Sequence, residues 1–546
     1  MKKNESISRD NGTQFWVCAG ALVLLLTSIL SRDITRPFYG IHSWAEAHTP
    51  WLARVQIRNG FSYTKGFMTW SVGNPPTQNP RRYLDHPQLG SLINAAFMSV
   101  LGINEWALRV VNIAATIITL LLFLKILKNL TDEKTTLLAG LLFCLFPVIG
   151  YFGANLWPYP FALWALWNYL VIIRELKENI QPAKRHIILL ALCLFMILQL
   201  SWEGFFFALG IGVHYVFRCI RRKQLPDKIL LTTLTAAPLS SLALDFGIMA
   251  IGFGNWQKII ELLKWRGGSG EMAEHIWSAW FAKLWEHATT NFTLPILLTV
   301  IVYLTVGQML ILASKSSKDK EFAGRGFPHF WLFSLPAIFQ LFILKGCLWR
   351  HQTWERPLCF PIAIAGAAGI MLLGDIAGKI SKRLVNAAMI LLVCVFFIAS
   401  IMGTNYYYNI RWQLPEKIEM FKFLNQRIPP DKDLLSFEDF IIRQNPAKGD
   451  FYRPEIAWYL DREIVQARTL SDIESCAKTG KYPYYLVPVV ATQELFSLSL
   501  INELKKRYQL IEYFPSIQPQ EKYGRFYKAG MYPYMIFDLN SKITSQ

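Results

Sequence analysis

Between two apolar runs, residues 31–105 carry two clusters of ionisable side chains: His42-Ser-Trp-Ala-Glu46-Ala-His48 and Arg81-Arg82-Tyr83-Leu84-Asp85-His86-Pro87. The rest of the chain is mainly apolar, because 53% of its 546 residues are hydrophobic and only 17% are charged. This composition is typical of an integral membrane protein. A membrane protein rarely keeps such groups near its spans without a use for them, so we interpret the two clusters as a candidate functional site.

The basic residues indicate orientation in a membrane and not nucleic-acid binding. The formal net charge is +18, but Lys and Arg fall largely in short connections between apolar runs. We therefore expect no nucleic-acid partner. The eight cysteines are scattered singly, and no Cys-x-x-Cys pair is present. The sequence predicts neither a metal cage of cysteines nor a disulfide framework.

Eleven apolar runs are long enough, or nearly so, to cross a membrane. With the N-terminus inside, five basic connections also lie inside, as the positive-inside rule requires. The run 87–101 is too short to span comfortably, and counting it as a span would place all five basic connections outside. We therefore expect it to form a helix along the outer interface. The basic connections are 125–134, 174–185, 218–228, 314–328 and 378–383. The runs lie near 15–31, 106–124, 135–153, 156–173, 186–201, 204–220, 229–252, 294–313, 329–345, 357–377 and 384–403.

The same parity places three further polar segments outside: the turn Trp202-Glu203-Gly204, the loop 254–292 and the loop 345–357. The loop 254–292 carries five tryptophans at roughly helical spacing, which is typical of amphipathic helices in the headgroup region. Polar groups therefore gather on one predicted face of the membrane.

The character of the sequence changes after Gly403. Short strands alternate with a helix over residues 492–507, which predicts a small α/β domain on the outer side. The expected strands cover residues 433–437, 464–466, 484–489, 509–514 and 534–538. The predicted fold is an α-helical polytopic membrane protein with two parts. Residues 1–403 form the transmembrane domain, including a first outer loop 32–105 with interfacial helices, and residues 404–546 form an extracytoplasmic α/β domain.

A site walled by spans at the outer interface suits a substrate with a lipid tail and a polar head, such as a polyprenyl-phosphate sugar. Sugar transfer from such a donor needs a carboxylate that takes the acceptor proton or holds a metal ion. It also needs cations over the leaving phosphate. The outer carboxylates are Glu46 and Asp85. The outer cationic or hydrogen-bonding groups are Arg81, Arg82, His86, Arg350, His351 and Arg356.

Several short motifs resemble the C-type glycosyltransferase (GT-C) superfamily, specifically the family-39 group of protein mannosyltransferases and lipid A aminoarabinose transferases. In the first loop these motifs are His42-x-Trp44-x-Glu46-Ala, Tyr83-Leu-Asp85-His86-Pro87-x-Leu and Gly102-x-x-Glu105-x-x-x-Arg109. Further along the chain they are Leu200-Ser-Trp202-Glu203-Gly-Phe and His351-x-x-Trp354-x-x-Pro357. The resemblance covers most of residues 1–403.

The resemblance implies transfer of one sugar from a polyprenyl phosphate to an acceptor, with the acid of the first loop as catalytic base. By position this acid is Glu46, and we expect Asp85 to assist it. Many relatives carry Asp, often followed by Glu, where this chain has Ala45-Glu46. We expect seven substrate-binding residues: His42, Arg82, His86, Glu203, Arg350, His351 and Trp354.

The resemblance also sets the expected cofactors, partners and location. Relatives differ in metal use, so no cofactor is assigned and Mg or Mn is left open, with unknown ligands. The expected partners are the donor, membrane lipids and an acceptor that the sequence does not identify. The expected location is a bacterial cell membrane, with the N-terminus in the cytoplasm.

Other interpretations stay open at this stage. Glu46 could lie on the wet face of an interfacial helix, and Asp85-His86-Pro87 could simply begin a helix. His351 could be an ordinary interfacial histidine, and Glu203 could favour the positive end of its helix. A lipid flippase or transporter is the rival function. It predicts charges within the spans, where Asp245 is the exception to an otherwise apolar pattern.

Overall fold

The structure is a computed structural model that describes most of the chain. Asp85 and Trp265 lie outside the described residues, as do residues 314–326 of one predicted connection, and the side chain of Arg350 is likewise not described. The described residues are 2–78, 80–84, 86–154, 159–254, 256–264, 277–309, 327–379, 381–410, 415–442, 451–490, 497–514 and 533–543.

The chain forms two compact units, which we describe separately. Unit 1 comprises residues 1–34 and 109–407, and unit 2 comprises residues 35–108 and 408–546. The predicted organisation groups the first loop with the spans. In the structure residues 35–108, which include most of the predicted first outer loop 32–105, form one unit with residues 408–546. The division of the chain by packing therefore differs from the division that its apolar runs predict.

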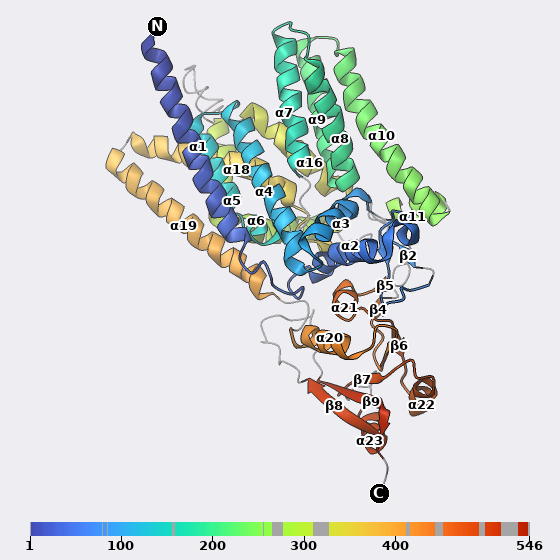
Figure 1. Cartoon of the computed structure of the whole chain (residues 1–546). Helices are drawn as coiled ribbons and strands as arrows, with labels where there is room; N and C mark the ends of the chain where they lie inside the picture. The colour runs from blue at the N-terminus through green and yellow to red at the C-terminus, as the bar shows by residue number, and fades with distance from the viewer. Residues whose placement is uncertain are drawn as a thin grey trace. The chain divides into compact units, whose positions relative to one another are not determined.

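Unit 1 is a bundle of helices. Helices α7, α8, α9 and α10 pack side by side (Figure 1). Helices α5, α13 and α16 pack against α18. The helices are α1 (Lys2–Leu30), α4 (Glu105–Lys128), α5 (Glu133–Leu145), α6 (Pro147–Phe152), α7 (Tyr159–Lys177), α8 (Lys184–Leu200), α9 (Glu203–Arg222), α10 (Lys228–Phe253), α11 (Trp256–Lys264), α12 (Trp277–Phe292), α13 (Leu294–Val302), α16 (Phe327–Ile343), α17 (Cys347–Arg350), α18 (Cys359–Gly378) and α19 (Lys382–Asn409). A π-helical turn, Tyr303–Gly307, continues α13, and a 3₁₀ turn, Arg356–Leu358, precedes α18.

Each of the eleven apolar runs coincides with helix in the described residues. Six of the described helices are long and apolar enough to cross a membrane, and a seventh span results if the bent pair α12 and α13 counts as one. The run 135–153 is broken at Phe146, whose extended backbone (ψ 125°) precedes Pro147. Helix α8 has 17 residues, about 26 Å of helix, which is near the lower limit for a span. A polytopic membrane protein is confirmed, and the number of crossings stays a prediction.

The interior of unit 1 is apolar and closely packed. The rings of Phe123 and Phe360 contact each other and those of Phe143 and Phe333, at centroid distances of 5.4–6.1 Å. At Gly369 of α18 a Cβ atom would lie 2.1 Å from the carbonyl oxygen of Thr299, so only glycine permits this approach of α18 to α13.

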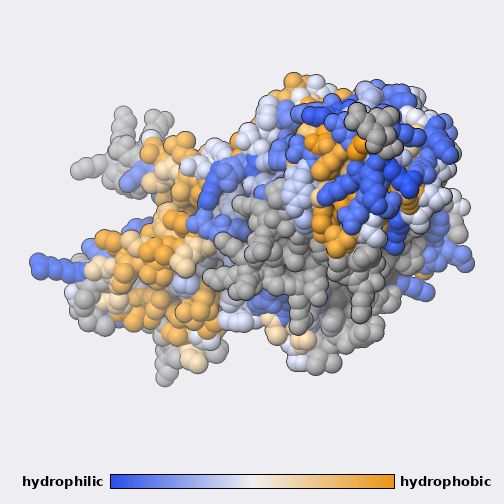
Figure 2. Space-filling view, turned by 90° about the horizontal axis from the view of Figure 1, so that it is seen from below, coloured by the Kyte–Doolittle hydropathy of each residue, from blue (hydrophilic) through white to orange (hydrophobic). Residues whose placement is uncertain are grey.

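Helices of unit 1 differ in what they face. Within the apolar window of α18, 78% of residues are buried inside the protein, against 11% for α19. Ile390, Leu391, Ile398 and Ile401 of α19 are exposed, and apolar side chains cover continuous areas of the surface (Figure 2). A lipid environment would satisfy such a surface, whereas water would not.

Unit 2 combines helices with three small sheets. The largest sheet has the order β6-β3-β7-β9-β8, in which β3 pairs in parallel with β6 and β7 while β9 pairs antiparallel with β7 and β8 (Figure 1). The helices are α2 (Ser43–Thr64), α3 (Leu89–Leu101), α20 (Pro415–Arg427), α21 (Pro454–Tyr459), α22 (Leu470–Lys478) and α23 (Leu498–Arg507). The strands are β1 (Thr69–Trp70), β2 (Arg81–Arg82), β3 (Leu434–Ser436), β4 (Ile441–Ile442), β5 (Phe451–Tyr452), β6 (Ile464–Gln466), β7 (Tyr484–Pro488), β8 (Tyr508–Phe514) and β9 (Tyr534–Lys542).

The α/β character predicted for the C-terminal segment is confirmed, since all five expected strands are present. The helix expected over 492–507 begins at Leu498 in the described residues. A single apolar core joins the two parts of unit 2: Trp51, Trp70 and Met98 of the first loop share it with Phe421 and Ile536 of the C-terminal segment.

Candidate active site

Glu46 lies in the first turn of α2 and is buried, with 5% of its surface exposed. The interpretation that it sits on the wet face of a helix is therefore wrong. Its Oε1 is 3.6 Å from Nη2 of Arg36, which is a charge contact longer than a close hydrogen bond. The positive end of the helix also favours a carboxylate at this position. Glu46 is thus a buried acid whose negative charge is compensated by Arg36.

Arg36 is itself held by aromatic rings. Its guanidinium lies 5.8 Å from the ring centre of Tyr39 and 4.9 Å from that of Tyr408, within the range of cation–π attraction. The sequence did not indicate a role for either tyrosine. Tyr408 in particular is far from the first loop in the chain. The pair of Arg36 and Glu46 is therefore fixed from both parts of unit 2.

The start of α2 has an unusual backbone. His42, the residue before the helix, has φ 59° and ψ 23°, a left-handed conformation that costs free energy in a residue other than glycine. His42 is buried, and the first hydroxyl of the helix, Ser43 Oγ, donates a 2.6 Å hydrogen bond to Glu455 Oε1 of α21. The surrounding structure therefore holds this strained turn and, with it, the direction of Glu46.

An aromatic cluster lines the next turn of α2. The imidazole of His48 stacks on Trp44 at 4.6 Å and accepts a 2.8 Å hydrogen bond at Nε2 from the indole nitrogen of Trp70. Tyr83 lies against His48 at 4.4 Å and stacks on His86 at 5.6 Å. These ring contacts bring residues 42–48 and residues 81–87 of the first loop together. The sequence indicated their proximity only because both segments lie in the same loop.

The segment around Asp85 is braced by Gln88, a residue that sequence reasoning missed. The Gln88 side chain accepts a hydrogen bond from the Met68 backbone N–H at 2.6 Å and donates to the carbonyls of Tyr83 (3.1 Å) and His86 (2.7 Å). Asp85 itself lies outside the described residues. The helix after it, α3, begins at Leu89, so the interpretation that Pro87 occupies the first helical position is wrong.

Arg82 lies on β2, which pairs antiparallel with β1. Its guanidinium is 4.3 Å from the ring centre of Phe67, and its side chain is partly buried while that of neighbouring Arg81 is exposed. Successive side chains of a strand point to opposite sides, so the two arginines serve different environments. The described donor-binding candidates of the first loop, His42, Arg82 and His86, thus all belong to unit 2 with Glu46.

Glu203 belongs to unit 1, in the first turn of α9. It is 3% exposed, forms an ion pair with Arg356 and accepts a hydrogen bond from the Tyr159 hydroxyl. Its role in substrate binding stays a prediction. These contacts give it a structural role, which joins α7, α9 and the turn before α18. Tyr159 is a further member that the sequence did not indicate.

His351 and Trp354 also belong to unit 1, after α17, with ring centres 6.4 Å apart. Their loop is fastened by a buried group on α12 and α19. Asn291 donates from its side chain to the carbonyl of Gln352 at 2.8 Å and to Glu355 at 3.3 Å, and it accepts from the Tyr407 hydroxyl. Burial raises the pKa of Glu355 well above its usual range, which favours the protonated form. Asn291 is fully buried.

The expected substrate-binding residues belong to both units, and their common role stays a prediction. Among the described residues, no three His, Cys, Asp or Glu side chains gather in a way that could hold a metal ion. Glu46, the described carboxylate of the first loop that we expected to act, faces Arg36. The described residues therefore do not fit a metal site.

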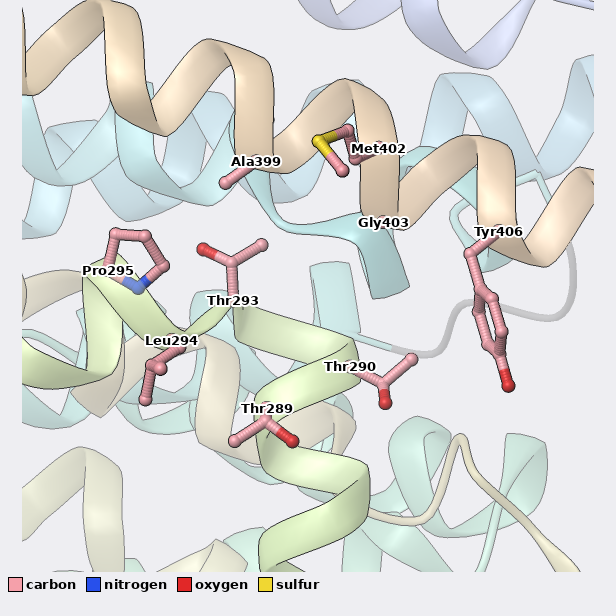
Figure 3. Close-up of a pocket in the computed structure, with 9 residues that line it drawn as sticks. All are labelled: Thr289, Thr290, Thr293, Leu294, Pro295, Ala399, Met402, Gly403 and Tyr406. Carbon is pink, nitrogen blue, oxygen red and sulfur yellow. The ribbon is translucent and has the colours of Figure 1, made fainter.

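Unit 1 also carries a groove between the bend of α12 and α13 and the C-terminal part of α19 (Figure 3). The two helices meet at 106° around Thr293, which has φ 62°. No predicted site residue lines this groove. Its lining residues are Thr289, Thr290, Thr293, Leu294, Pro295, Ala399, Met402, Gly403 and Tyr406.

Three comparisons with known proteins bear on the identity of the chain. The family model described as dolichyl-phosphate-mannose-protein mannosyltransferase matches residues 85–237. No curated protein matches the sequence significantly.

Solved structures match over most of the chain. ArnT from Cupriavidus metallidurans bound to undecaprenyl phosphate is similar with a TM-score of 0.56 and 10% identity, over 96% of this chain and 98% of that one. The oligosaccharyltransferase of Archaeoglobus fulgidus in its apo form is similar with a TM-score of 0.53 and 11% identity, over 86% of this chain and 69% of that one. At such low identity the similarity shows the fold. The chain therefore has the fold of these two proteins, the C-type (GT-C) fold that the motifs of the first loop predicted, and residues 85–237 also match the mannosyltransferase family model.

Proposed function

We propose that the protein transfers a single sugar from a polyprenyl-phosphate donor to a hydroxyl acceptor, with Glu46 as the general base. The observation that carries this proposal is the environment of Glu46, a buried acid in the first turn of α2 with its charge compensated by Arg36. Two of the structures with the same fold were solved with a lipid phosphate, undecaprenyl phosphate in ArnT and a dolichol-phosphate in the archaeal oligosaccharyltransferase AglB.

The chemistry assigns a distinct task to each group. As the acceptor oxygen attacks the sugar, its proton becomes acidic, and a carboxylate within reach takes it. The leaving phosphate gathers negative charge at the same time, and cationic donors stabilise that charge. In our proposal Arg82 and His86 serve the phosphate from the first loop, and Arg350 or His351 serve it from the loop after α16. Asp85 assists Glu46, and a divalent cation would require ligands beyond the described residues.

We also propose the orientation that the basic connections predict. The N-terminus and these connections face the cytoplasm of a bacterial cell, and unit 2 with its candidate base faces the outer side of the cell membrane. Donors of this kind present their sugars at the membrane surface, which agrees with a base in a loop between spans.

The proposal is tested by incubating the purified protein in lipid nanodiscs with a panel of radiolabelled polyprenyl-phosphate sugars. We expect at least one donor to release its sugar to water or to an acceptor, and the matching diphosphate-linked donors to remain intact. Consumption of only diphosphate-linked donors would contradict the single-phosphate proposal. The flippase alternative makes the opposite prediction, because labelled donor would then cross the membrane of proteoliposomes without being consumed.

The flippase alternative is not favoured by the positions of the charges. Asp245, the acid within predicted span 229–252, is 3% exposed on α10, which packs against α8. The neighbouring polar groups of these helices are paired with each other, since Gln199 of α8 donates to Ser241 of α10. A single buried acid that packs between two helices does not by itself form a transport pathway.

A further inference from the structure

We propose that helix α21 of the C-terminal segment positions α2, and with it Glu46, so that Ser43, Glu455 and Arg54 are positioning residues of the transferase. This inference rests on the proposed function, since it assumes that Glu46 is the base. It gives the C-terminal segment a role in the reaction and not only in folding.

The first contact lies at the N-terminal ends of the two helices. Ser43 is completely buried and donates a 2.6 Å hydrogen bond to Glu455, which is 2% exposed. Ser43 and Glu46 are three residues apart on α2, so they lie on the same face of the helix, about one turn apart. A hydrogen bond that fixes Ser43 therefore limits how far Glu46 can rotate or slide.

The second contact lies at the C-terminal end of α21. Arg54, 4% exposed, donates from Nη1 to the carbonyl of Trp458 and from Nη2 to that of Ala457, both at 2.6 Å. The same guanidinium is 3.1 Å from Asp461 Oδ1 and 4.9 Å from the ring centre of Trp458. A planar guanidinium can serve two carbonyls at the end of a helix at once, whereas an ammonium cannot reach both in this geometry.

The guanidinium remains charged in this buried position. Burial lowers the pKa of Arg54 to about 10, against the attraction of Asp461, so the side chain carries its charge at neutral pH. Buried ionic contacts of this kind add little net stability, because the cost of desolvation offsets most of the attraction. Their main effect is to fix the orientation of the groups that they join. The apolar core shared by α2 and α21 already holds the helices together, and the polar contacts fix their register.

A third contact lies next to the strained turn. The Tyr459 hydroxyl accepts a 2.7 Å hydrogen bond from the backbone N–H of Phe38 and donates to Glu105 at 2.9 Å. Phe38 lies in the segment that contains Arg36 and leads to His42. Helix α21 thus contacts the chain before α2, its first residue and its third turn.

Reaction rates depend steeply on such register, because a displacement of about 1 Å can cost roughly 100-fold in rate. We therefore expect Ser43→Ala and Arg54→Lys to lower kcat by about 10- to 100-fold while the donor KM changes by less than about twofold. Ser91→Ala is the matched control, since Ser91 is a buried serine near the start of α3 in the same unit. It removes a hydroxyl without touching α21, and we expect parental kcat.

The experiment measures kcat and KM for the donor together with hydrogen exchange of the α2 amides, on folded full-length protein. Faster exchange at residues 44–47 in Ser43→Ala, with a lower kcat, supports the inference. Parental kcat in both Ser43→Ala and Arg54→Lys overturns it, and Ser43→Ala alone decides if Arg54→Lys does not fold. Full activity of Glu46→Gln would contradict the base assignment instead, so the two failures are distinguishable.

Discussion

The two units of this protein use buried polar groups for different purposes. In unit 1 the ion pair of Arg356 with Glu203 and the group around Asn291 fasten one loop to the helices beside it. In unit 2 the bonds from Ser43 and Arg54 join segments 412 and 404 residues apart in sequence. Unit 1 therefore follows from local apolar patterns with a few polar fastenings, while unit 2 exists only because distant parts of the chain meet.

The largest stability effect should come from breaking the ion pair in unit 1. Arg356→Met leaves the Glu203 carboxylate buried, and removing one partner of a buried pair costs about 3–5 kcal/mol. Thermal unfolding in detergent should show a clear loss, with part of it recovered in the double variant Glu203→Gln/Arg356→Met. The control is Lys283→Met, which removes an exposed pair with Glu286 and should change stability by less than about 1 kcal/mol. Equal stability of Arg356→Met and Lys283→Met would show that unit 1 does not depend on this fastening.

A smaller effect is expected on donor binding in unit 2. Arg82→Ala should weaken donor binding by about 10- to 150-fold, the roughly 1.5–3 kcal/mol of a hydrogen bond to a charged group. Arg82→Lys should fall between the parent and Arg82→Ala, because lysine keeps the charge and loses the two-pronged contact.

The neighbouring arginine provides the control for this measurement. Arg81 precedes Arg82 on β2 and is exposed, so Arg81→Ala should bind donor within about twofold of the parent at high salt. If the two alanine variants bind alike, Arg82 contacts only lipid headgroups, and the phosphate contact from unit 2 is lost from the account.

The smallest effect is a change in the pH dependence of stability. Burial lowers the pKa of Lys417 in α20 to about 8, although Glu438 and Glu455 oppose the shift. The unfolded chain therefore binds more protons than the folded chain between about pH 8 and 10.5, and the free energy of unfolding rises with pH in that window. Lys417→Met removes this term, so the variant should gain stability over the parent at pH 7.5 and lose part of that advantage by pH 9.5.

Unfolding of parent and Lys417→Met at the two pH values measures this difference directly, because other titrating groups are common to both proteins. A stability difference that does not change between pH 7.5 and 9.5 would contradict the assignment of a buried, charged Lys417.

The sequence predicted unit 1 well for a physical reason. Apolar runs of 15–25 residues form helices in almost any packing, because their backbone groups must bond within the segment. Every predicted run coincides with helix in the described residues, but the break at Phe146 and Pro147 within 135–153 and the π-helical turn Tyr303–Gly307 within 294–313 were missed. Pro147 stands at the break in the sequence. Because the residues on both sides of it are apolar, the whole run was interpreted as one span.

The candidate site was predictable in part. The sequence singled out Glu46, His42 and His86 because ionisable groups stand out against an apolar chain, and their roles stay predictions. Arg36 and Gln88 were missed because their roles depend on contacts with Glu46 and with the Met68 backbone, which the sequence does not show. Glu455 was missed because 412 residues separate it from Ser43. No periodicity in the sequence encodes such a pairing, so the joining of the first loop to the C-terminal segment could come only from the structure.

The most direct test of the account is the turnover of Glu46→Gln with a polyprenyl-phosphate sugar that the parent consumes. The substitution keeps the size of the side chain and removes its basicity. A general base contributes about 10²- to 10⁴-fold, so the turnover of the folded variant should fall by at least about 100-fold. The control is Glu419→Gln, which changes an exposed glutamate of α20 in the same unit and should leave turnover unchanged. Near-parental turnover of folded Glu46→Gln would contradict the assignment of the base.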